Sequence, residues 1–138
     1  MIKKSIFLLA FFALVSCSTN QNLENCIQSL PLNLNTDLNN PQLINAQTPG
    51  GFAELNGGTK GILLFNKNGN EFVAFDKLCP ANDCNAPMIF ENRLLKCSCD
   101  NSEYSVDFGG APQTNGFQCP AIEYQVFRNG TTLRITNF

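Results

Sequence analysis

Cys79-Pro80-Ala81-Asn82-Asp83-Cys84 and Lys96-Cys97-Ser98-Cys99-Asp100-Asn101-Ser102-Glu103-Tyr104 are the two stretches that decide how this chain is organised. Together they hold four of the chain's cysteines, and the segment 85–96 between them is short enough to form one hairpin. Two cysteine-bearing loops that fold against each other usually hold a metal or close disulfides. The function of the chain depends on which of the two applies.

The composition is that of one globular domain. The chain has 138 residues, of which 43% are hydrophobic, and 12 phenylalanines supply most of the aromatic core. Charged residues make up 14% of the chain and the formal net charge is −2. Because no basic cluster is present, we expect no nucleic-acid partner.

The N-terminus has the features of a bacterial export signal. Lys3 and Lys4 form a positive region, and 6–15 is an apolar segment too short to span a bilayer. The following Leu14-Val15-Ser16-Cys17 resembles the lipoprotein box, in which the peptide is cleaved before a cysteine that becomes acylated. This resemblance implies a signal peptide over 1–16 and a membrane anchor at Cys17. An ordinary secretory peptide with an incidental cysteine is the alternative.

The lipoprotein interpretation divides the chain into three parts. Residues 17–28 are expected to form the lipidated cysteine and a polar tether, and 29–138 the folded domain, with a cysteine-loop subdomain at about 78–117. The protein is then expected in the bacterial cell envelope. Ser18, which follows the modified cysteine, is compatible with the outer membrane.

Alternating apolar and polar residues predict short strands. This pattern covers 30–35 and 52–55, and residues 43–46 form a weaker strand candidate. Pro31 restricts the first strand to the edge of a sheet or to a strand start, because proline cannot donate to the ladder.

Four hairpins are predicted in the remainder of the chain. Asn68-Gly69 separates the apolar runs 60–66 and 71–75, and Asn129-Gly130 separates 121–128 from 131–138; Asn-Gly accepts the positive φ of tight turns. A further hairpin joins 88–90 to 93–95, and a fourth begins with 103–106 followed by the turn 107–110. No helix of convincing length is predicted, so the fold class is all-β with short antiparallel strands.

The order of these elements resembles the Rieske domain, and specifically the Rieske-like lipoproteins of the Bacteroidetes type. The Rieske pattern is Cys-x-His-x-x-Cys, then Cys-x-Cys-His-Gly-Ser-x-Phe/Tyr, then a returning Pro-x-x-x-Tyr strand. The two boxes match its four cysteines, Ser102 and Tyr104 match its serine and aromatic residue, and 120–124 matches the returning strand. The resemblance covers about 51–138 and implies an all-β Rieske-like fold.

The departures from the family pattern lie at the metal ligands. A Rieske centre holds one iron with two cysteines and the other with two histidines. The histidine positions are occupied here by Ala81 and Asp100, and the chain contains no histidine. Alanine offers no donor atom, and one carboxylate does not replace two imidazoles. We therefore expect no cofactor of the normal Rieske type, and no other metal.

The resemblance implies two disulfides instead. In the Rieske geometry the first cysteines of the two boxes are neighbouring ligands, and the second cysteines are bonded in the subgroup that has them. Without a cluster in an oxidising compartment, this implies Cys79–Cys97 and Cys84–Cys99, each worth about 3 kcal/mol in the chain-entropy model. Cys26 and Cys119 remain, and we expect them to form a third bridge between the N-terminal segment and the last hairpin.

Three alternatives use the same cysteines differently. Cys79, Cys84, Cys97 and Cys99 are the candidate ligands of a four-cysteine [2Fe–2S] cluster or of a zinc site. The Cys-x-Cys spacing is tight for one iron, and zinc loops favour two to four residues between paired ligands. Export of an unfolded chain also argues against a cluster inserted in the cytoplasm.

Thiol–disulfide exchange by Cys97-Ser98-Cys99 is the third alternative. A reactive cysteine needs an electropositive setting, whereas Asp100 and Glu103 offset Lys96 here.

Enzymatic catalysis is not indicated. There is no histidine base, and Asp76 and Asp83 are interpreted as turn caps. Four phenylalanines are interpreted as core residues: Phe52, Phe65, Phe72 and Phe75.

The favoured hypothesis is a membrane-anchored, Rieske-like lipoprotein that lacks a functional cluster and acts as a disulfide-stapled binding or structural module. An electron-transfer protein with an atypical cysteine-ligated [2Fe–2S] cluster is the alternative. The expected partners are the membrane, through Cys17, and an envelope protein whose identity the residues do not reveal.

Overall fold

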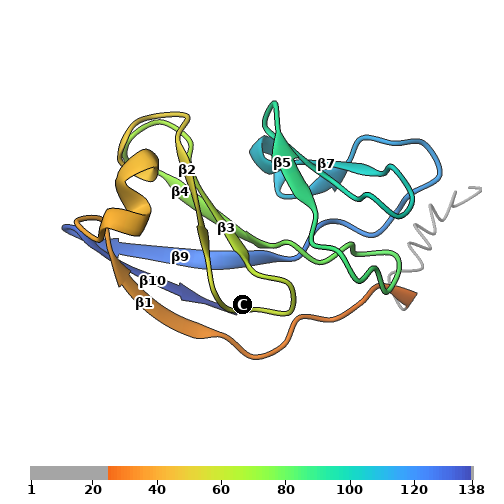
Figure 1. The fold of residues 1–138 in the computed structure, drawn as a ribbon, viewed down its shortest axis with the longest axis horizontal. Helices are drawn as coiled ribbons and strands as arrows, with labels where there is room; N and C mark the ends of the chain where they lie inside the picture. Colours follow the sequence, from red (N-terminus) through yellow and green to blue (C-terminus); the bar gives the residue numbers. More distant parts are fainter. Residues whose placement is uncertain (1–24, 138) are drawn as a thin grey trace, which may run out of the picture.

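The computed structural model describes residues 25–137. The fold is built almost entirely from short strands, as the sequence predicts (Figure 1). In chain order the elements are β1 (Asn33–Asp37), η2 (Pro41–Gln47), β2 (Phe52–Leu55), β3 (Ile62–Asn66), β4 (Phe72–Asp76), β5 (Ile89–Glu91), β6 (Leu94–Lys96), β7 (Glu103–Ser105), η3 (Val106–Phe108), β8 (Ala111–Pro112), β9 (Glu123–Asn129) and β10 (Thr132–Thr136).

The strands form two antiparallel sheets. The larger sheet has the order β1-β10-β9-β4-β3-β2, and the smaller one the order β5-β6-β7-β8. Within the larger sheet, β4 and β9 share only two residue pairs, Ala74 with Tyr124 and Phe75 with Glu123. The sheet curls around this short junction, and the smaller sheet lies beside β3 and β4 (Figure 1).

The central hairpin β3–β4 is buried on both faces. All five residues of each strand are buried, which explains the uninterrupted apolar run 62–65. Ile62 and Leu64 face a core inside the curl of the larger sheet. Leu63 and Phe65 face a second core that includes Cys79, Cys84 and Cys97. The cysteine loops are therefore held against a rigid, doubly buried hairpin.

The predicted hairpins are confirmed. Gly69 and Gly130, the glycines of the two Asn-Gly turns, have φ of 95° and 63°. These positive values are what glycine supplies at low steric cost, so local turn chemistry determines where β3–β4 and β9–β10 reverse. The edge position predicted for the first strand is also confirmed, because β1 pairs only with β10.

The strand predicted over 43–46 is wrong, because this segment is the 3₁₀ helix η2. The side chain of Asn40 accepts a hydrogen bond from the backbone N–H of Gln42 (3.1 Å), and Pro41 opens the helix. Leu43 and Ala46 are both buried at a spacing of three, which is the period of a 3₁₀ turn. The cap, rather than the apolar pattern, determines this segment.

Two smaller predictions also need correction. The first strand begins at Asn33 and not at residue 30, and Leu30 is 55% exposed. Phe52 is 39% exposed and packs edge-on against Phe90 at 4.8 Å between ring centroids, whereas Phe65, Phe72 and Phe75 are buried as expected. Phe52 lies on an edge strand, so its outer side has no neighbouring strand.

The signal peptide, Cys17 and residues 18–24 of the tether lie outside the described residues. Among residues 25–137, no helix has the length and hydrophobicity needed to cross a membrane.

Candidate functional site

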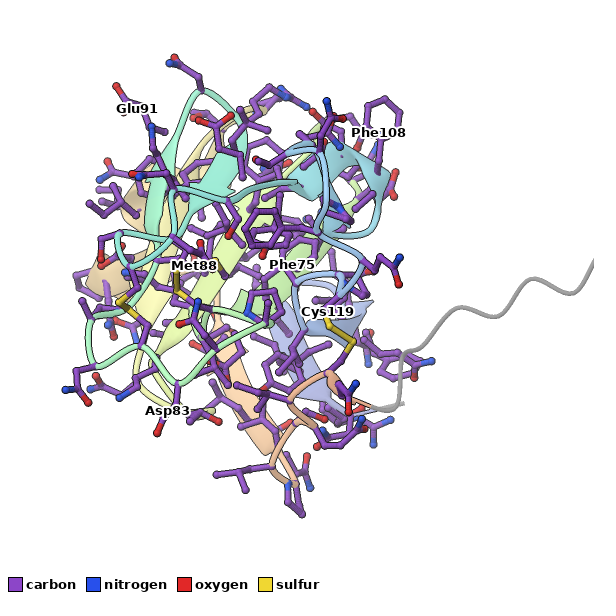
Figure 2. The ribbon with its side chains drawn as sticks, turned by 90° about the vertical axis from the view of Figure 1, so that its right-hand side faces the viewer. Phe75, Asp83, Met88, Glu91, Phe108 and Cys119 are labelled. Atoms are coloured by element: carbon purple, nitrogen blue, oxygen red, sulfur yellow. A yellow bond between two sulfur atoms is a disulfide. The ribbon has the colours of Figure 1, made fainter. Side chains whose placement is uncertain are left out.

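The first cysteine box lies in the loop between β4 and β5. The backbone N–H of Met88 donates to the carbonyl of Lys77 (2.6 Å), which closes residues 78–87 into one excursion from the sheets. Cys79 and Cys84 are 0% and 1% exposed, and both pack in the second core. Met88 lies inward, whereas Asp83 lies at the rim of the loop (Figure 2). The buried side chains of Cys79, Cys84 and Met88 thus anchor this loop to the second core.

The second cysteine box is the connection of the β6–β7 hairpin. The backbone N–H of Cys97 donates to the carbonyl of Ser102 (2.9 Å), and the N–H of Asn101 donates to the carbonyl of Cys97 (2.9 Å). Asn101 has a φ of 59°, a left-handed conformation that asparagine tolerates. This tight turn buries Cys97 completely and leaves Cys99 exposed.

Three disulfides join the six cysteines of the described chain. Their pairs are Cys79–Cys97, Cys84–Cys99 and Cys26–Cys119, with Cα–Cα distances of 5.6, 6.0 and 5.4 Å. These are the same pairs that the family resemblance and the remaining cysteines implied. The first two lie side by side and tie the two boxes together, and the third attaches the N-terminal segment to the loop before β9.

Ala81 and Asp100 occupy the two positions that the Rieske resemblance matches to histidine, and their surroundings differ from each other. Ala81 is exposed, and nothing in its side chain can bind a metal. Asp100 is half-buried and accepts hydrogen bonds on both carboxylate oxygens. The side-chain amide of Asn82 donates to Oδ2 (2.5 Å), and the backbone N–H (2.9 Å) and hydroxyl (2.5 Å) of Ser102 donate to Oδ1. Asp100 therefore links the two boxes non-covalently.

A short polar chain continues from this link into the core. The hydroxyl of Tyr104 donates to Oγ of Ser102 (2.8 Å), and both residues are fully buried. Burial raises the pKa of Tyr104, and the charge of Asp100 raises it further, while the hydrogen bond to Ser102 opposes the shift. The chain Tyr104–Ser102–Asp100–Asn82 thus runs from β7 to the first box.

Asp76 confirms its predicted role as a cap at the end of β4. Its buried carboxylate accepts from the backbone N–H groups of Thr59 (2.6 Å), Lys60 (3.1 Å) and Leu78 (2.9 Å), and from the hydroxyl of Tyr124 (2.9 Å). A buried carboxylate is stable only when its oxygens are satisfied in this way. It fixes the point at which the chain leaves the sheet for the first box.

Sequence reasoning overlooked Asn82. It precedes Asp83 and is half-buried, and nothing in its spacing marks it as the partner of Asp100. Asp83, interpreted as a turn cap, is exposed and makes no side-chain hydrogen bond within residues 25–137. Whether Asn82 or Asp83 reaches the second box depends on the loop conformation, which only the tertiary contacts define.

A surface cavity of about 340 Å³ lies away from the boxes, next to the third disulfide. It is lined by Cys26, Gly109, Ala121 and Glu123 among others. Burial raises the pKa of Glu123, and the neighbouring charge of Lys67 opposes this shift. Among residues 25–137, Gln28 and Ser29 are the other polar side chains in its lining, and Glu123 is its one carboxylate.

The comparisons with known proteins concern the fold. No protein-family model and no curated protein matches the chain. Among solved structures, the chain is similar to the ferredoxin of carbazole 1,9a-dioxygenase from Nocardioides aromaticivorans IC177, with 17% sequence identity, a TM-score of 0.50, and coverage of 78% of this chain and 98% of that one. The fold is Rieske-like.

A further match is the complex of reduced oxygenase and oxidized ferredoxin in carbazole 1,9a-dioxygenase. It has 16% sequence identity and a TM-score of 0.47, and it covers 64% of this chain and 82% of that chain.

A [2Fe–2S] cluster is the group that a Rieske-like fold implies, and the residues present do not fit it. The two thiolate positions, Cys79 and Cys97, are bonded to each other. Ala81 has no donor atom, and both oxygens of Asp100 are occupied as hydrogen-bond acceptors. The two-cysteine, two-histidine donor set of the Rieske centre is absent from the chain, since it contains no histidine.

The two boxes bring three cysteine sulfurs close together. The Sγ atoms of Cys79, Cys84 and Cys97 all lie within 4.8 Å of one another. A four-cysteine metal site would need both disulfides to be reduced first, because thiolates are the species that bind metals.

Proposed function

We propose that the protein is a membrane-anchored, Rieske-like lipoprotein of the bacterial cell envelope that works without a [2Fe–2S] cluster, as a disulfide-stapled binding or structural module. The observation that carries the proposal is the state of the four ligand positions. Cys79 and Cys97 form a disulfide, Ala81 is inert, and Asp100 serves as a hydrogen-bond acceptor.

The loop pair has what a binding module needs, which is a rigid shape. Two disulfides close loops with sequence separations of 18 and 15 residues. In the chain-entropy model each contributes about 3 kcal/mol by restricting the unfolded chain. The Asp100 link and the buried sulfurs add a defined geometry, so the loops can present a fixed surface without a metal.

Iron content tests the absence of a cluster. Protein purified anaerobically from its native envelope is expected to contain less than a stoichiometric amount of iron and to show no visible charge-transfer bands. Stoichiometric iron with such bands would overturn the proposal and would favour the electron-transfer alternative, with Cys79, Cys84, Cys97 and Cys99 as ligands. Non-reducing peptide mapping of the same sample provides the control, since intact disulfides and cluster ligation exclude each other.

The membrane anchor rests on the Leu14-Val15-Ser16-Cys17 box. We expect a clickable fatty acid to label the wild-type chain in cells and the protein to fractionate with the outer membrane. Cys17→Ser is the matched control, because it leaves the apolar segment intact and removes only the acylated thiol. Equal labelling of both chains would exclude lipidation at Cys17.

A further inference from the structure

The two disulfides that join the boxes lie so close that a thiolate released from one can attack the other. Cys84 Sγ lies within 4.8 Å of both Cys79 Sγ and Cys97 Sγ, which are bonded to one another. A thiolate at Cys84 would therefore face a disulfide at nearly contact distance. Thiol–disulfide exchange proceeds by attack of a thiolate on one sulfur of a disulfide, through a mixed disulfide.

The four sulfurs differ sharply in access. Cys79 and Cys97 are 0% exposed and Cys84 is 1% exposed. Cys99 is exposed in the turn between β6 and β7. An external thiol can therefore reach the Cys84–Cys99 bond from the Cys99 side, whereas the Cys79–Cys97 bond is shielded within the second core.

We propose that the loop pair is a thiol–disulfide exchange site for an external dithiol, in which Cys99 is the sulfur attacked first and Cys84 relays the exchange to Cys79–Cys97. In the first step a thiolate of the dithiol attacks Cys99 Sγ. The Cys84–Cys99 bond breaks, and Cys84 leaves as a thiolate. The second thiol of the dithiol then displaces Cys99, so the dithiol becomes a disulfide and the protein gains two thiols.

The relay step is redox-neutral. The Cys84 thiolate attacks Cys79 Sγ or Cys97 Sγ, a new disulfide to Cys84 forms, and the other sulfur leaves as a thiolate. The Cys99 thiolate then attacks Cys84 Sγ of this new bond, which re-forms Cys84–Cys99 and releases the remaining sulfur of the buried pair as a thiolate. A second dithiol then reduces Cys84–Cys99 at the exposed Cys99. In total two dithiols are oxidised and two disulfides are reduced, and electrons and protons balance without any further reagent.

Proximity, rather than a lowered pKa, makes this step fast. Two lysines near the boxes in the sequence form ion pairs with glutamates. Nζ of Lys96 lies 3.4 Å from Oε1 of Glu103, and Nζ of Lys77 lies 2.6 Å from Oε1 of Glu54. Intramolecular attack by a sulfur held within 4.8 Å gains the large effective concentration of a positioned nucleophile. Ser98 Oγ, at 4.0 Å from Cys84 Sγ, is placed to donate to the thiolate once it forms.

Two single variants isolate the relay. Cys99→Ser and Cys84→Ser both remove the same disulfide, so both lose the same restriction of the unfolded chain. They differ in the thiol that remains, which is buried beside Cys79–Cys97 in Cys99→Ser and exposed in Cys84→Ser. Each is purified at pH 5, transferred to pH 8.5, and then quenched with iodoacetamide for non-reducing peptide mapping.

The expected result is a clear difference between these variants. Cys99→Ser is expected to accumulate Cys84–Cys79 or Cys84–Cys97 bonds after transfer to pH 8.5, whereas Cys84→Ser keeps Cys79–Cys97. With limiting dithiothreitol, the sulfurs of Cys79 and Cys97 are expected to be alkylated at least tenfold faster in the wild-type protein than in Cys84→Ser, which lacks the relay sulfur. Reduction of Cys26–Cys119, which takes no part in the relay, measures any general loosening of the fold and is expected to be equal in these two proteins.

Two outcomes would overturn the proposal. One is a single Cys79–Cys97 disulfide in Cys99→Ser with Cys84 alkylated throughout. The other is reduction of Cys79–Cys97 in Cys84→Ser at the wild-type rate, which would mean that the bond opens by local unfolding and not through Cys84. Neither outcome bears on iron content, so the test is separate from that of the proposed function.

Discussion

Asp100 connects the two cysteine boxes through hydrogen bonds, beside the disulfides that join them covalently. Its carboxylate accepts from Asn82 in the first box and from Ser102 in its own box. Hydrogen bonds to a charged acceptor contribute more than neutral ones, typically about 1.5–3 kcal/mol. Asp100, which the resemblance matches to a histidine position, therefore has a structural role.

We expect Asp100→Ala to lower the free energy of unfolding by about 1–2 kcal/mol, because the buried hydroxyl proton and the backbone N–H of Ser102 lose their acceptor. Urea titration measures the loss. Asp100→Asn is the matched control, since its carbonyl can still accept from Ser102 but its amide faces the amide of Asn82. A double-mutant cycle with Asn82→Ala should give a coupling of about 0.5 kcal/mol or more, and zero coupling would show that the Asn82 bond does not contribute.

Tyr124 makes the stability depend on alkaline pH. Burial raises its pKa, and the charge of Asp76 and the hydrogen bond to Asp76 raise it further; Tyr104 shifts in the same direction. The folded chain thus keeps the phenolic protons above pH 10, where the unfolded chain releases them. The stabilising contribution is fully present below about pH 10 and is lost as the pH rises through the folded pKa values.

The free energy of unfolding of the wild-type protein is therefore expected to fall above pH 10, by up to about 1.4 kcal/mol per pH unit for each of Tyr104 and Tyr124. Tyr124→Phe should be less stable than wild type at pH 7, because Asp76 loses one donor, but its stability should fall less steeply between pH 10 and 11. Urea titrations at pH 7, 9, 10 and 11 measure both effects. Parallel slopes for the two proteins would contradict the assignment of the shift to Tyr124.

At the scale of elements, η2 is positioned by an unusually close backbone approach. A Cβ built on Gly51 would lie 1.8 Å from the carbonyl oxygen of Asn45 and 3.0 Å from that of Thr48. Leu43 and Ala46 fill the core inside the curled sheet from this position. The absence of a side chain at Gly51 is thus what lets η2 pack against the start of β2.

Gly51→Ala is expected to destabilise the protein by about 2–3 kcal/mol, as overpacking against backbone atoms usually does. Gly50→Ala is the neighbouring control. Gly50 has a φ of 81° with open space around its Cβ position, so alanine there costs only about 1–2 kcal/mol of backbone strain. Thermal and urea unfolding of both variants measure the order, and a larger loss for Gly50→Ala would contradict the packing argument.

At the scale of the whole molecule, the third disulfide spans the longest loop. Cys26–Cys119 has a sequence separation of 93 residues. Residues 25–32 run from the cysteine-loop end of the molecule to β1, and the N–H of Ile27 donates to the carbonyl of Pro80 (3.2 Å) (Figure 1). Cys119 is the more buried of the bridge's two cysteines (Figure 2). The bridge therefore attaches residues 25–32 to the loop before β9, and the hydrogen bond of Ile27 attaches them to the first cysteine box.

We expect Cys26→Ala/Cys119→Ala to lose more stability than Cys84→Ala/Cys99→Ala. The chain-entropy model gives about 4.6 kcal/mol for a loop of this length, against about 3 kcal/mol for the shorter one. Urea titration of both double variants at pH 7 measures the difference. The reverse order would show that loop closure is not the main contribution of the third bridge.

Much of the architecture could be predicted because it is local. The turns at Gly69 and Gly130 could be predicted from the Asn-Gly pairs, which accept the positive φ that the structure has there. The burial of β3 on both faces agrees with the apolar run 62–65. The strand predicted over 43–46 failed because the cap at Asn40 outweighs a short apolar pattern. At the site, the residues of the boxes were identified, but the partner of Asp100 was not, since it comes from a loop eighteen residues earlier.

The sequence by itself determined the all-β class, the hairpins and the absence of histidine, because composition and turn chemistry are properties of the residues themselves and their neighbours. Only the tertiary structure decided that Asp100 bonds to Asn82, that Cys84 lies beside the Cys79–Cys97 bond, and that Cys99 alone of these four sulfurs faces solvent. These features depend on how two loops, held by a doubly buried hairpin, pack against each other. Spacing along a chain does not define such contacts.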